Sequence, residues 1–185
     1  SEQETVVWNP SEGFSDEQLE QLEGIDAVIN LGGESIFGLW TENRRRRIRE
    51  SRVNTTKNLA EGLAKLKNKP EVLISASAIG VYGDRGDEEL TVVMTPAGGA
   101  LQKMLTPFQL GIGGKLGSGR QYMSWITLND LIGLIHHCLA SGKISGPVNA
   151  TAPNPVTNSE MTRTLATVLC RPAFVNAPEF VLRSF

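Results

Sequence analysis

IDAVINLGG, residues 25–33, joins a nearly continuous apolar run to two adjacent glycines. A strand inside a parallel sheet is covered on both faces, so its apolar residues follow one another instead of alternating with polar ones. Glycines at its end allow a turn and a close approach of the backbone to another group. We therefore expect residues 25–31 to form a buried parallel strand that ends in a turn at Gly32 and Gly33.

The segments that follow alternate between helix and strand. Residues 41–66 begin polar and then place Leu59, Leu63 and Leu66 at spacings of four and three, which predicts a helix with one apolar stripe. Residues 72–75, VLIS, form the next strand candidate. Short apolar strands that alternate with helices predict an α/β fold with a mainly parallel sheet.

Other elements are predicted on similar grounds. Two helix starts carry a capping box, in which the side chains of the N-cap residue and of a Glu or Gln three residues later each accept a hydrogen bond from the other residue's backbone amide. They are Ser15 with Gln18 and Thr157 with Glu160. The remaining candidates are strands at residues 5–8, 123–127 and 147–150, helices at residues 100–108 and 128–140, and a glycine-rich loop at residues 111–120.

The bulk composition excludes several classes of protein. The 185 residues are 40% hydrophobic and carry a net charge of −2, which suits one globular domain and disfavours a nucleic-acid partner. No apolar run is long enough to span a membrane, and no signal-peptide pattern is present at the N-terminus. Cys138 and Cys170 lie far apart without metal-like spacing, which favours a reduced, cytoplasmic compartment.

Two clusters of charged or titratable residues have ordinary explanations. The arginines at residues 44–47 spread around a helix and are flanked by Glu42 and Glu50, which predicts a solvated face. His136 and His137 are adjacent, so on a helix they diverge by about 100° and do not easily share a metal ion. We expect no metal site.

Two features of a dinucleotide-binding α/β sheet are missing. Such a sheet usually carries G-x-G-x-x-G after its first strand, and here the glycines of residues 111–119 are not preceded by a predicted strand. Residues 90–98 contain no crossover helix, although a parallel neighbour needs a connection of about a dozen residues. We expect that a first strand and an internal segment near Leu90–Met94 of a longer protein are missing from the chain.

Several stretches resemble, in order, the extended short-chain dehydrogenase/reductases, also called the NAD-dependent epimerase/dehydratase superfamily. They are DAVINLGGES (26–35), SRVNTTKNLAEGL (51–63), EVLISASAIGVYGD (71–84), GSGRQYMSWITLNDLIGLI (117–135) and GPVNATAPNPVTNSEM (146–161). Three stretches resemble more closely one subfamily, described as sugar-nucleotide epimerases and sometimes labelled SulA-type cell-division inhibitors. They are NLGGESI, the run at residues 40–53 and GIGGKLGSGRQYMSWI.

This resemblance implies a Rossmann-like, doubly wound parallel sheet with a small C-terminal substrate-binding part. Residues 1–95 would form an incomplete dinucleotide-binding part, and residues 96–185 the remaining Rossmann elements and the substrate-binding part, within one structural unit. The implied function is an NAD(P)-binding epimerase/dehydratase-like oxidoreductase that acts on a nucleotide sugar or related small molecule by transient hydride transfer. NADP(H) is the expected cofactor, with NAD(H) as the alternative, and a homodimer is compatible with the resemblance.

The resemblance also implies site residues. In the superfamily a strand-end serine or threonine and a tyrosine act on one substrate oxygen beside the nicotinamide. Ser77 is the first match for the serine, Ser75 the second, and Tyr82 lies in the V-Y-G turn. The positions matching cofactor contacts are Asn30, Leu31, Gly32, Gly33, Asn54, Ser75 and Ala76, and the substrate candidates are Arg120, Gln121, Tyr122 and Trp125.

Several of these positions also have a structural alternative. A strand-end serine can be bonded to a neighbouring backbone carbonyl. Gly32 and Gly33 can form a simple turn, Asn54 can be a surface residue, and Trp125 can belong to the core. Arg120 is the substrate candidate with the clearest chemistry, because a guanidinium binds phosphate through two hydrogen bonds.

The superfamily's Tyr-x-x-x-Lys pair is absent from the sequence. The only tyrosines are Tyr82 and Tyr122, and the residues four positions later are Gly86 and Ile126. Since the lysine of this pair lowers the tyrosine pKa, its absence leaves two other functions open. One is a non-catalytic nucleotide-binding sensor or scaffold, and the other is a module that serves only interactions.

Overall fold

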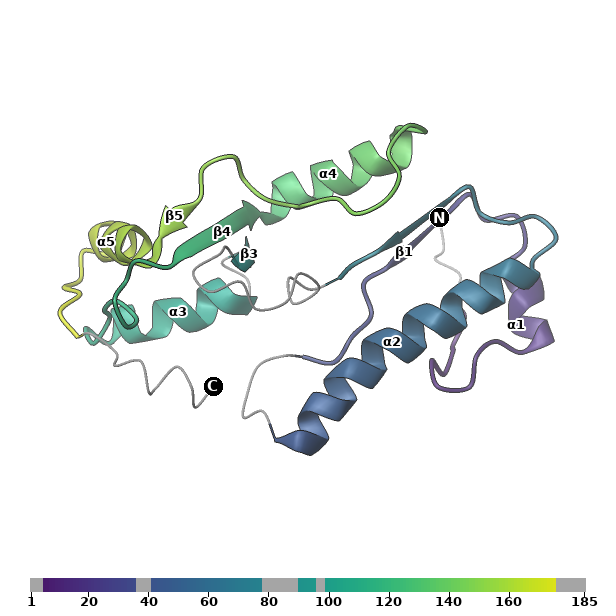
Figure 1. The fold of residues 1–185 in the computed structure, drawn as a ribbon, viewed down its shortest axis with the longest axis horizontal. Helices are drawn as coiled ribbons and strands as arrows, with labels where there is room; N and C mark the ends of the chain where they lie inside the picture. The colour runs from purple at the N-terminus through teal and green to yellow at the C-terminus, as the bar shows by residue number, and fades with distance from the viewer. Residues whose placement is uncertain (1–4, 36–40, 78–89, 96–98, 176–185) are drawn as a thin grey trace. The chain divides into compact units, whose positions relative to one another are not determined.

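The chain divides into two compact units, which are described in turn (Figure 1). The computed structural model describes residues 5–35, 41–77, 90–95 and 99–175. Unit 1 comprises residues 1–77 and unit 2 residues 78–185. The parts predicted from the sequence met after residue 95, within one structural unit. The α/β class with parallel strands is confirmed in both units.

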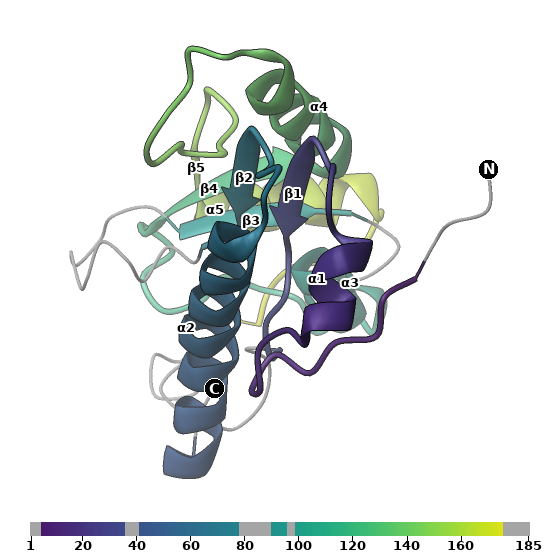
Figure 2. The same cartoon turned by 90° about the vertical axis from the view of Figure 1, so that its right-hand side faces the viewer.

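Unit 1 is a pair of parallel strands joined by a long helix. Its elements are α1 (Asp16–Gln21), β1 (Ala27–Asn30), α2 (Glu42–Lys65) and β2 (Val72–Ser75). β1 and β2 lie side by side, and Asn30 is in register with Ser75 (Figure 2). Parallel neighbours need a crossover connection, and α2 provides it. Both strands therefore end at the same edge of the pair.

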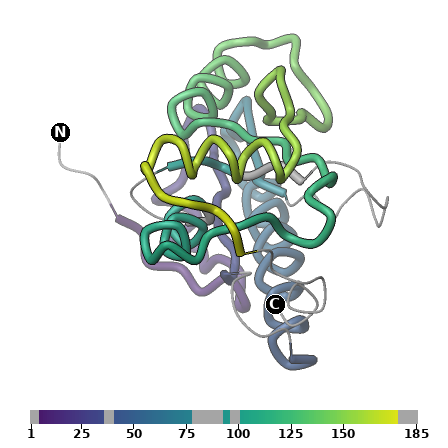
Figure 3. The backbone as a smooth tube through the Cα atoms, turned by 90° about the vertical axis from the view of Figure 1, so that its left-hand side faces the viewer, coloured from purple at the N-terminus to yellow at the C-terminus, as the bar shows by residue number. Residues whose placement is uncertain are grey.

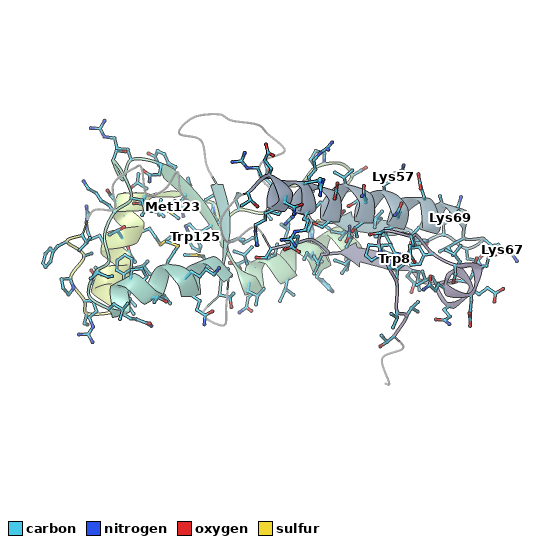
Figure 4. The ribbon with its side chains drawn as sticks, turned by 90° about the horizontal axis from the view of Figure 1, so that it is seen from below. Trp8, Lys57, Lys67, Lys69, Met123 and Trp125 are labelled. Atoms are coloured by element: carbon cyan, nitrogen blue, oxygen red, sulfur yellow. The ribbon has the colours of Figure 1, made fainter. Side chains whose placement is uncertain are left out.

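The core of unit 1 lies between its helices and one face of the strand pair. Leu59, Leu63 and Leu66 are its buried centre, so the predicted apolar stripe of α2 is confirmed. The partly buried residues packed against them are Trp8, Phe14, Leu19, Leu22, Ile25 and Val28. The rings of Trp8 and Phe14 stack with their centroids 4.3 Å apart, and Figure 4 labels Trp8 near α1 and α2.

Two expectations for unit 1 were wrong. Residues 5–8 form no strand, because the Trp8 Nε1 donates a hydrogen bond to the Gly13 carbonyl (2.8 Å) and its ring stacks on Phe14. The second face of the strand pair is not buried either, and the Ile29 side chain is 43% exposed. Both helices of this unit pack into the core on the opposite face, so none of the described elements of the unit covers Ile29.

Unit 2 contains a three-stranded sheet in the order β3-β4-β5. Its elements are β3 (Leu90–Met94), α3 (Gly99–Gln109), β4 (Tyr122–Thr127), α4 (Leu128–Ala140), β5 (Val156–Thr157) and α5 (Asn158–Val168). β3 pairs with β4 in parallel and β5 pairs with β4 antiparallel. β3 was not predicted from the sequence, and the predicted strand at residues 147–150 is wrong. The chain instead meets β4 at Ala152, whose amide donates to the Trp125 carbonyl (2.7 Å).

Both predicted capping boxes are confirmed. The Ser15 amide donates to Gln18 Oε1 (2.9 Å), and the Gln18 amide donates to Ser15 Oγ (3.3 Å). Thr157 and Glu160 repeat this arrangement at the start of α5. The hydrogen bonds that the Thr157 backbone and side chain donate lower the pKa of Glu160. Each box satisfies amides that the first turn of a helix leaves without an internal partner.

No helix in the described part of the chain combines the length and the apolar character that a membrane crossing requires. Cys138 is half-buried and Cys170 is exposed, and both are free thiols.

Two helix-interior glycines offer a matched stability test. A Cβ at Gly62 would overlap the Phe14 ring, whereas a Cβ at Gly133 in α4 would meet nothing within 4 Å. Alanine favours a helix over glycine by up to about 1 kcal/mol. We expect Gly133→Ala to raise the free energy of unfolding by up to that amount. Gly62→Ala should lower it by about 1–3 kcal/mol because the ring must move. Urea unfolding measures both, and a stabilised Gly62→Ala variant would contradict the described packing.

The Glu23 carboxylate should make the stability of unit 1 depend on pH. It accepts hydrogen bonds from the Lys67 and Asn68 amides (2.8 and 3.0 Å), and these bonds lower the pKa of Glu23. Their stabilisation is present above the unfolded-state pKa of about 4.3 and is lost as the pH falls through the lower folded-state pKa. Glu23→Gln should therefore be less stable than wild type at neutral pH, and the difference should shrink on acidification. A gap that stays constant down to strongly acidic pH would contradict this linkage. Glu20→Gln, which removes no described side-chain hydrogen bond, is the control.

Candidate functional site

A buried amide joins the ends of the two strands in unit 1. The Asn30 side chain is at the carboxyl end of β1 and only 8% of the residue is exposed. Its Nδ2 donates to Ser75 Oγ on β2 (3.1 Å) and to Thr56 Oγ1 on α2 (3.2 Å). We call these three residues the Asn30 cluster. It brings a strand-end serine, a helix threonine and the β1 terminus to one point.

The same asparagine also fixes the backbone beyond both strands. Its Oδ1 accepts a hydrogen bond from the Gly32 amide (3.1 Å), and its carbonyl accepts one from the Ala76 amide (2.9 Å). Both Nδ2 protons and the Oδ1 of Asn30 thus have partners, as a buried carboxamide requires.

The loop that follows β1 lies close to α2. The Glu34 amide donates to Ser51 Oγ (2.9 Å), and Arg44 Nη2 donates to the Ser35 carbonyl (2.9 Å). A Cβ at Gly33 would stand 3.1 Å from Arg52 Cζ, so the guanidinium lies directly over this residue. A side chain at Gly33 would therefore displace Arg52.

The remaining candidates of unit 1 lie around this cluster. Leu31 is 68% exposed, and Ala76 and Ser77 are exposed just after β2. Asn54 is on the exposed side of α2. Tyr82 lies outside the described residues.

Sequence reasoning missed three residues of α2, namely Ser51, Arg52 and Thr56. A usable signal was present, because Arg52, Thr56, Leu59 and Leu63 recur at helical spacing and so share one face. Asn54 falls off this face. The stripe of leucines, extended back toward the helix start, points to the polar residues near Asn30.

The substrate candidates of unit 2 are not on one face of their strand. Side chains alternate along β4, so Tyr122, Ser124 and Ile126 face one way and Trp125 the other. Tyr122 is 49% exposed. Trp125, labelled with Met123 in Figure 4, is half-buried and its Nε1 donates to the Asn154 carbonyl (3.1 Å).

The glycine-rich loop before β4 is held by its own chain. The buried Asn158 at the start of α5 accepts a hydrogen bond from the Leu116 amide (2.8 Å), and Gln121 Nε2 donates to the Leu116 carbonyl (2.9 Å). The Val175 amide donates to the Gly113 carbonyl (3.2 Å), where the chain returns to the loop (Figure 3). These glycines thus serve close packing, while Arg120 at the end of the loop is exposed.

The Asn30 cluster can present a hydroxyl and an open stretch of backbone to a ligand. Ser75 Oγ accepts a hydrogen bond from the Asn30 side-chain amide, so the serine hydroxyl can donate its own hydrogen bond to another oxygen. Gly32 and Gly33, which follow Asn30, are exposed. Such an edge suits a polar ligand that contacts both the serine hydroxyl and the loop backbone.

Removing the Asn30 amide tests its role. Asn30→Ala leaves the Gly32 amide and the two hydroxyls without their partner and should lower the free energy of unfolding by about 1–3 kcal/mol. Asn54→Ala, on the exposed side of α2, should change it by no more than about 0.5 kcal/mol. Urea unfolding of both variants provides the comparison, and equal effects would contradict the cluster.

Comparison with known proteins reveals clear relatives, although no family model matches the chain. Epimerase family protein YfhF of Bacillus subtilis is 36% identical over 215 positions, which cover 96% of this chain and 70% of the relative. That span is at least 30 positions longer than the 185-residue chain. The relative therefore has residues inside the aligned region that have no counterpart here, in line with a missing internal segment.

Solved structures agree with this relationship. Human epimerase family protein SDR39U1 (isoform 2), crystallised with NADPH, is 27% identical with a TM-score of 0.79, over 94% of this chain and 70% of that one. A nucleoside-diphosphate sugar epimerase from Corynebacterium glutamicum is 32% identical with a TM-score of 0.72, over 96% and 45%. The chain thus belongs to the epimerase family of YfhF and SDR39U1, within the extended short-chain dehydrogenase/reductase superfamily.

Proposed function

We propose that this chain binds NADP(H) and acts as an epimerase/dehydratase-like oxidoreductase on a nucleotide sugar or related small molecule, by transient hydride transfer. The observation that carries the proposal is the Asn30 cluster, which gathers Ser75 and the Gly32 amide at the shared carboxyl edge of two parallel strands. Open α/β sheets bind their ligands at this edge. The NADPH in the human neighbour and the name of the Corynebacterium neighbour support the choice of ligands.

The residues at this edge fit a dinucleotide. Cβ atoms at Gly32 and Gly33 would stand 3.2 Å from Asn30 Oδ1 and 3.1 Å from Arg52 Cζ, so glycine leaves room for these two polar side chains beside the loop. Both glycines are exposed. The exposed Leu31 side chain offers apolar surface to a ring, and Ala76 adds no bulk after β2. A bound nicotinamide would supply the hydride carrier.

Ser75 is the residue that we propose to orient the substrate. Asn30 Nδ2 donates a hydrogen bond to Ser75 Oγ, which directs the serine O–H away from the cluster and toward a substrate carbonyl or hydroxyl. Ser77, exposed two residues later, is the alternative. Tyr82 is retained as the candidate for proton transfer, although no lysine stands four residues after it.

In unit 2, we propose that Arg120 binds the diphosphate of a nucleotide sugar. Its guanidinium is exposed and suits two-point binding of phosphate. Tyr122 offers exposed stacking surface on β4, and Gln121 and Trp125 support the site through their bonds to the Leu116 and Asn154 carbonyls.

The absence of Tyr-x-x-x-Lys favours a second candidate, a nucleotide-binding sensor or scaffold without catalysis. A cytoplasmic location belongs to both candidates and is supported by two free cysteines. The homodimer compatible with the family resemblance stays a prediction that light scattering would check.

Calorimetric titration with NADPH and then NADH tests the proposal. We expect micromolar binding of NADPH and weaker binding of NADH. Absence of binding of both, by protein with a cooperative unfolding transition, would contradict the proposed cofactor.

Adding UDP-glucose or dTDP-glucose to protein loaded with the oxidised cofactor NADP⁺, which can accept a hydride from the sugar, then separates the two candidates. The oxidoreductase should show a transient change in nicotinamide absorbance, which Ser75→Ala should slow about 100-fold if the hydroxyl orients the substrate. Cofactor binding with no absorbance change for any nucleotide sugar would favour the sensor.

A further inference from the structure

The Arg52 guanidinium lies beside the loop that follows β1. Its Cζ and Nη2 lie 3.1 and 3.3 Å from the position that a Cβ of Gly33 would take. Arg52 projects from α2 on the same face as Thr56, whose hydroxyl belongs to the Asn30 cluster, and it is half-buried. The positive charge therefore lies at the carboxyl edge of the strand pair.

Arg52 makes few hydrogen bonds and no ion pair with the described residues around it. Within the described residues its one hydrogen bond is from Nη1 to the Ile48 carbonyl one turn earlier on the same helix (3.2 Å). The described ion pairs are Arg46 with Glu50 and Lys57 with Glu61, and neither includes Arg52. A guanidinium has five N–H donors, so most of its capacity is available to a ligand.

Other residues already hold the loop that Arg52 covers. Asn30 binds the Gly32 amide, Ser51 binds the Glu34 amide and Arg44 binds the Ser35 carbonyl. Arg44 is thus the arginine that fastens this loop, whereas Arg52 contributes a charge above Gly33. A half-buried guanidinium without an acidic partner favours an anion.

We propose that Arg52 binds a phosphate group of the nucleotide cofactor, an inference that rests on the proposed function. Gly33 is exposed and Arg52 is half-buried beside it, so a phosphate bound to the guanidinium would lie next to the loop backbone. The cofactor offers this chemistry in two places, the diphosphate that NADH and NADPH share and the additional ribose phosphate of NADPH. Arg52 and the loop both belong to unit 1, and the proposal requires no residue from unit 2.

Calorimetric titration of NADPH and NADH into wild type, Arg52→Gln, Arg52→Lys and Arg49→Gln tests this role. Arg52→Gln should weaken phosphate-dependent binding about 10- to 100-fold, since it removes charge-assisted hydrogen bonds. Arg52→Lys keeps the charge without the two-point geometry and should fall between wild type and Arg52→Gln. Arg49→Gln removes an exposed charge from the same helix and should stay within about twofold of wild type.

The two cofactors distinguish the two phosphates. Equal losses for NADPH and NADH would identify the diphosphate as the partner, and a loss confined to NADPH would identify the ribose phosphate. Unchanged binding of both by folded Arg52→Gln, or by Arg52→Lys if the glutamine variant does not fold, would overturn the role of Arg52 alone. If wild type binds neither cofactor, the proposed function fails and this inference fails with it.

Discussion

The buried carboxamide of Asn30 is the interaction on which the edge of unit 1 depends. It bonds to β2 through Ser75, to α2 through Thr56 and to the following loop through Gly32. A buried amide is costly unless its donors and acceptor are paired, so these contacts favour one arrangement of the strand ends over alternatives. The position of the Ser75 hydroxyl follows from this requirement.

α2 performs two tasks because its residues at helical spacing pass from the core to the strand ends. Leu59 and Leu63 pack under the strands, while Thr56 and Arg52 continue the same stripe toward the carboxyl edge. Packing of the leucines sets the rotation of the helix, and that rotation decides which polar residues face Asn30. The stability of the core and the geometry of the candidate site are therefore linked through one rigid element.

The connection between the two units is short. Only 14 residues separate β2 from β3, and the two strands belong to different sheets. The alignment with the Bacillus relative contains at least 30 positions that have no counterpart here.

The sequence by itself determined the features whose causes lie within a few residues. Capping boxes at Ser15 and Thr157, the leucine stripe of α2 and the strand at residues 72–75 follow from local hydrogen bonding and periodicity, and the structure contains them. The Gly32–Gly33 end of β1 was visible for the same reason. These features were sufficient to predict the α/β class and to locate one edge of the candidate site.

Only the tertiary structure decided which side chains meet. Asn30 and Ser75 are 45 residues apart, and the register of two parallel strands brings them together. Thr56 and Arg52, rather than Asn54, face that edge because packing fixes the helix rotation. The pleat of β4 places Tyr122 and Trp125 on opposite faces, although they are near neighbours in the sequence. Local patterns specify the elements, whereas contacts between distant segments depend on register and rotation, which packing alone sets.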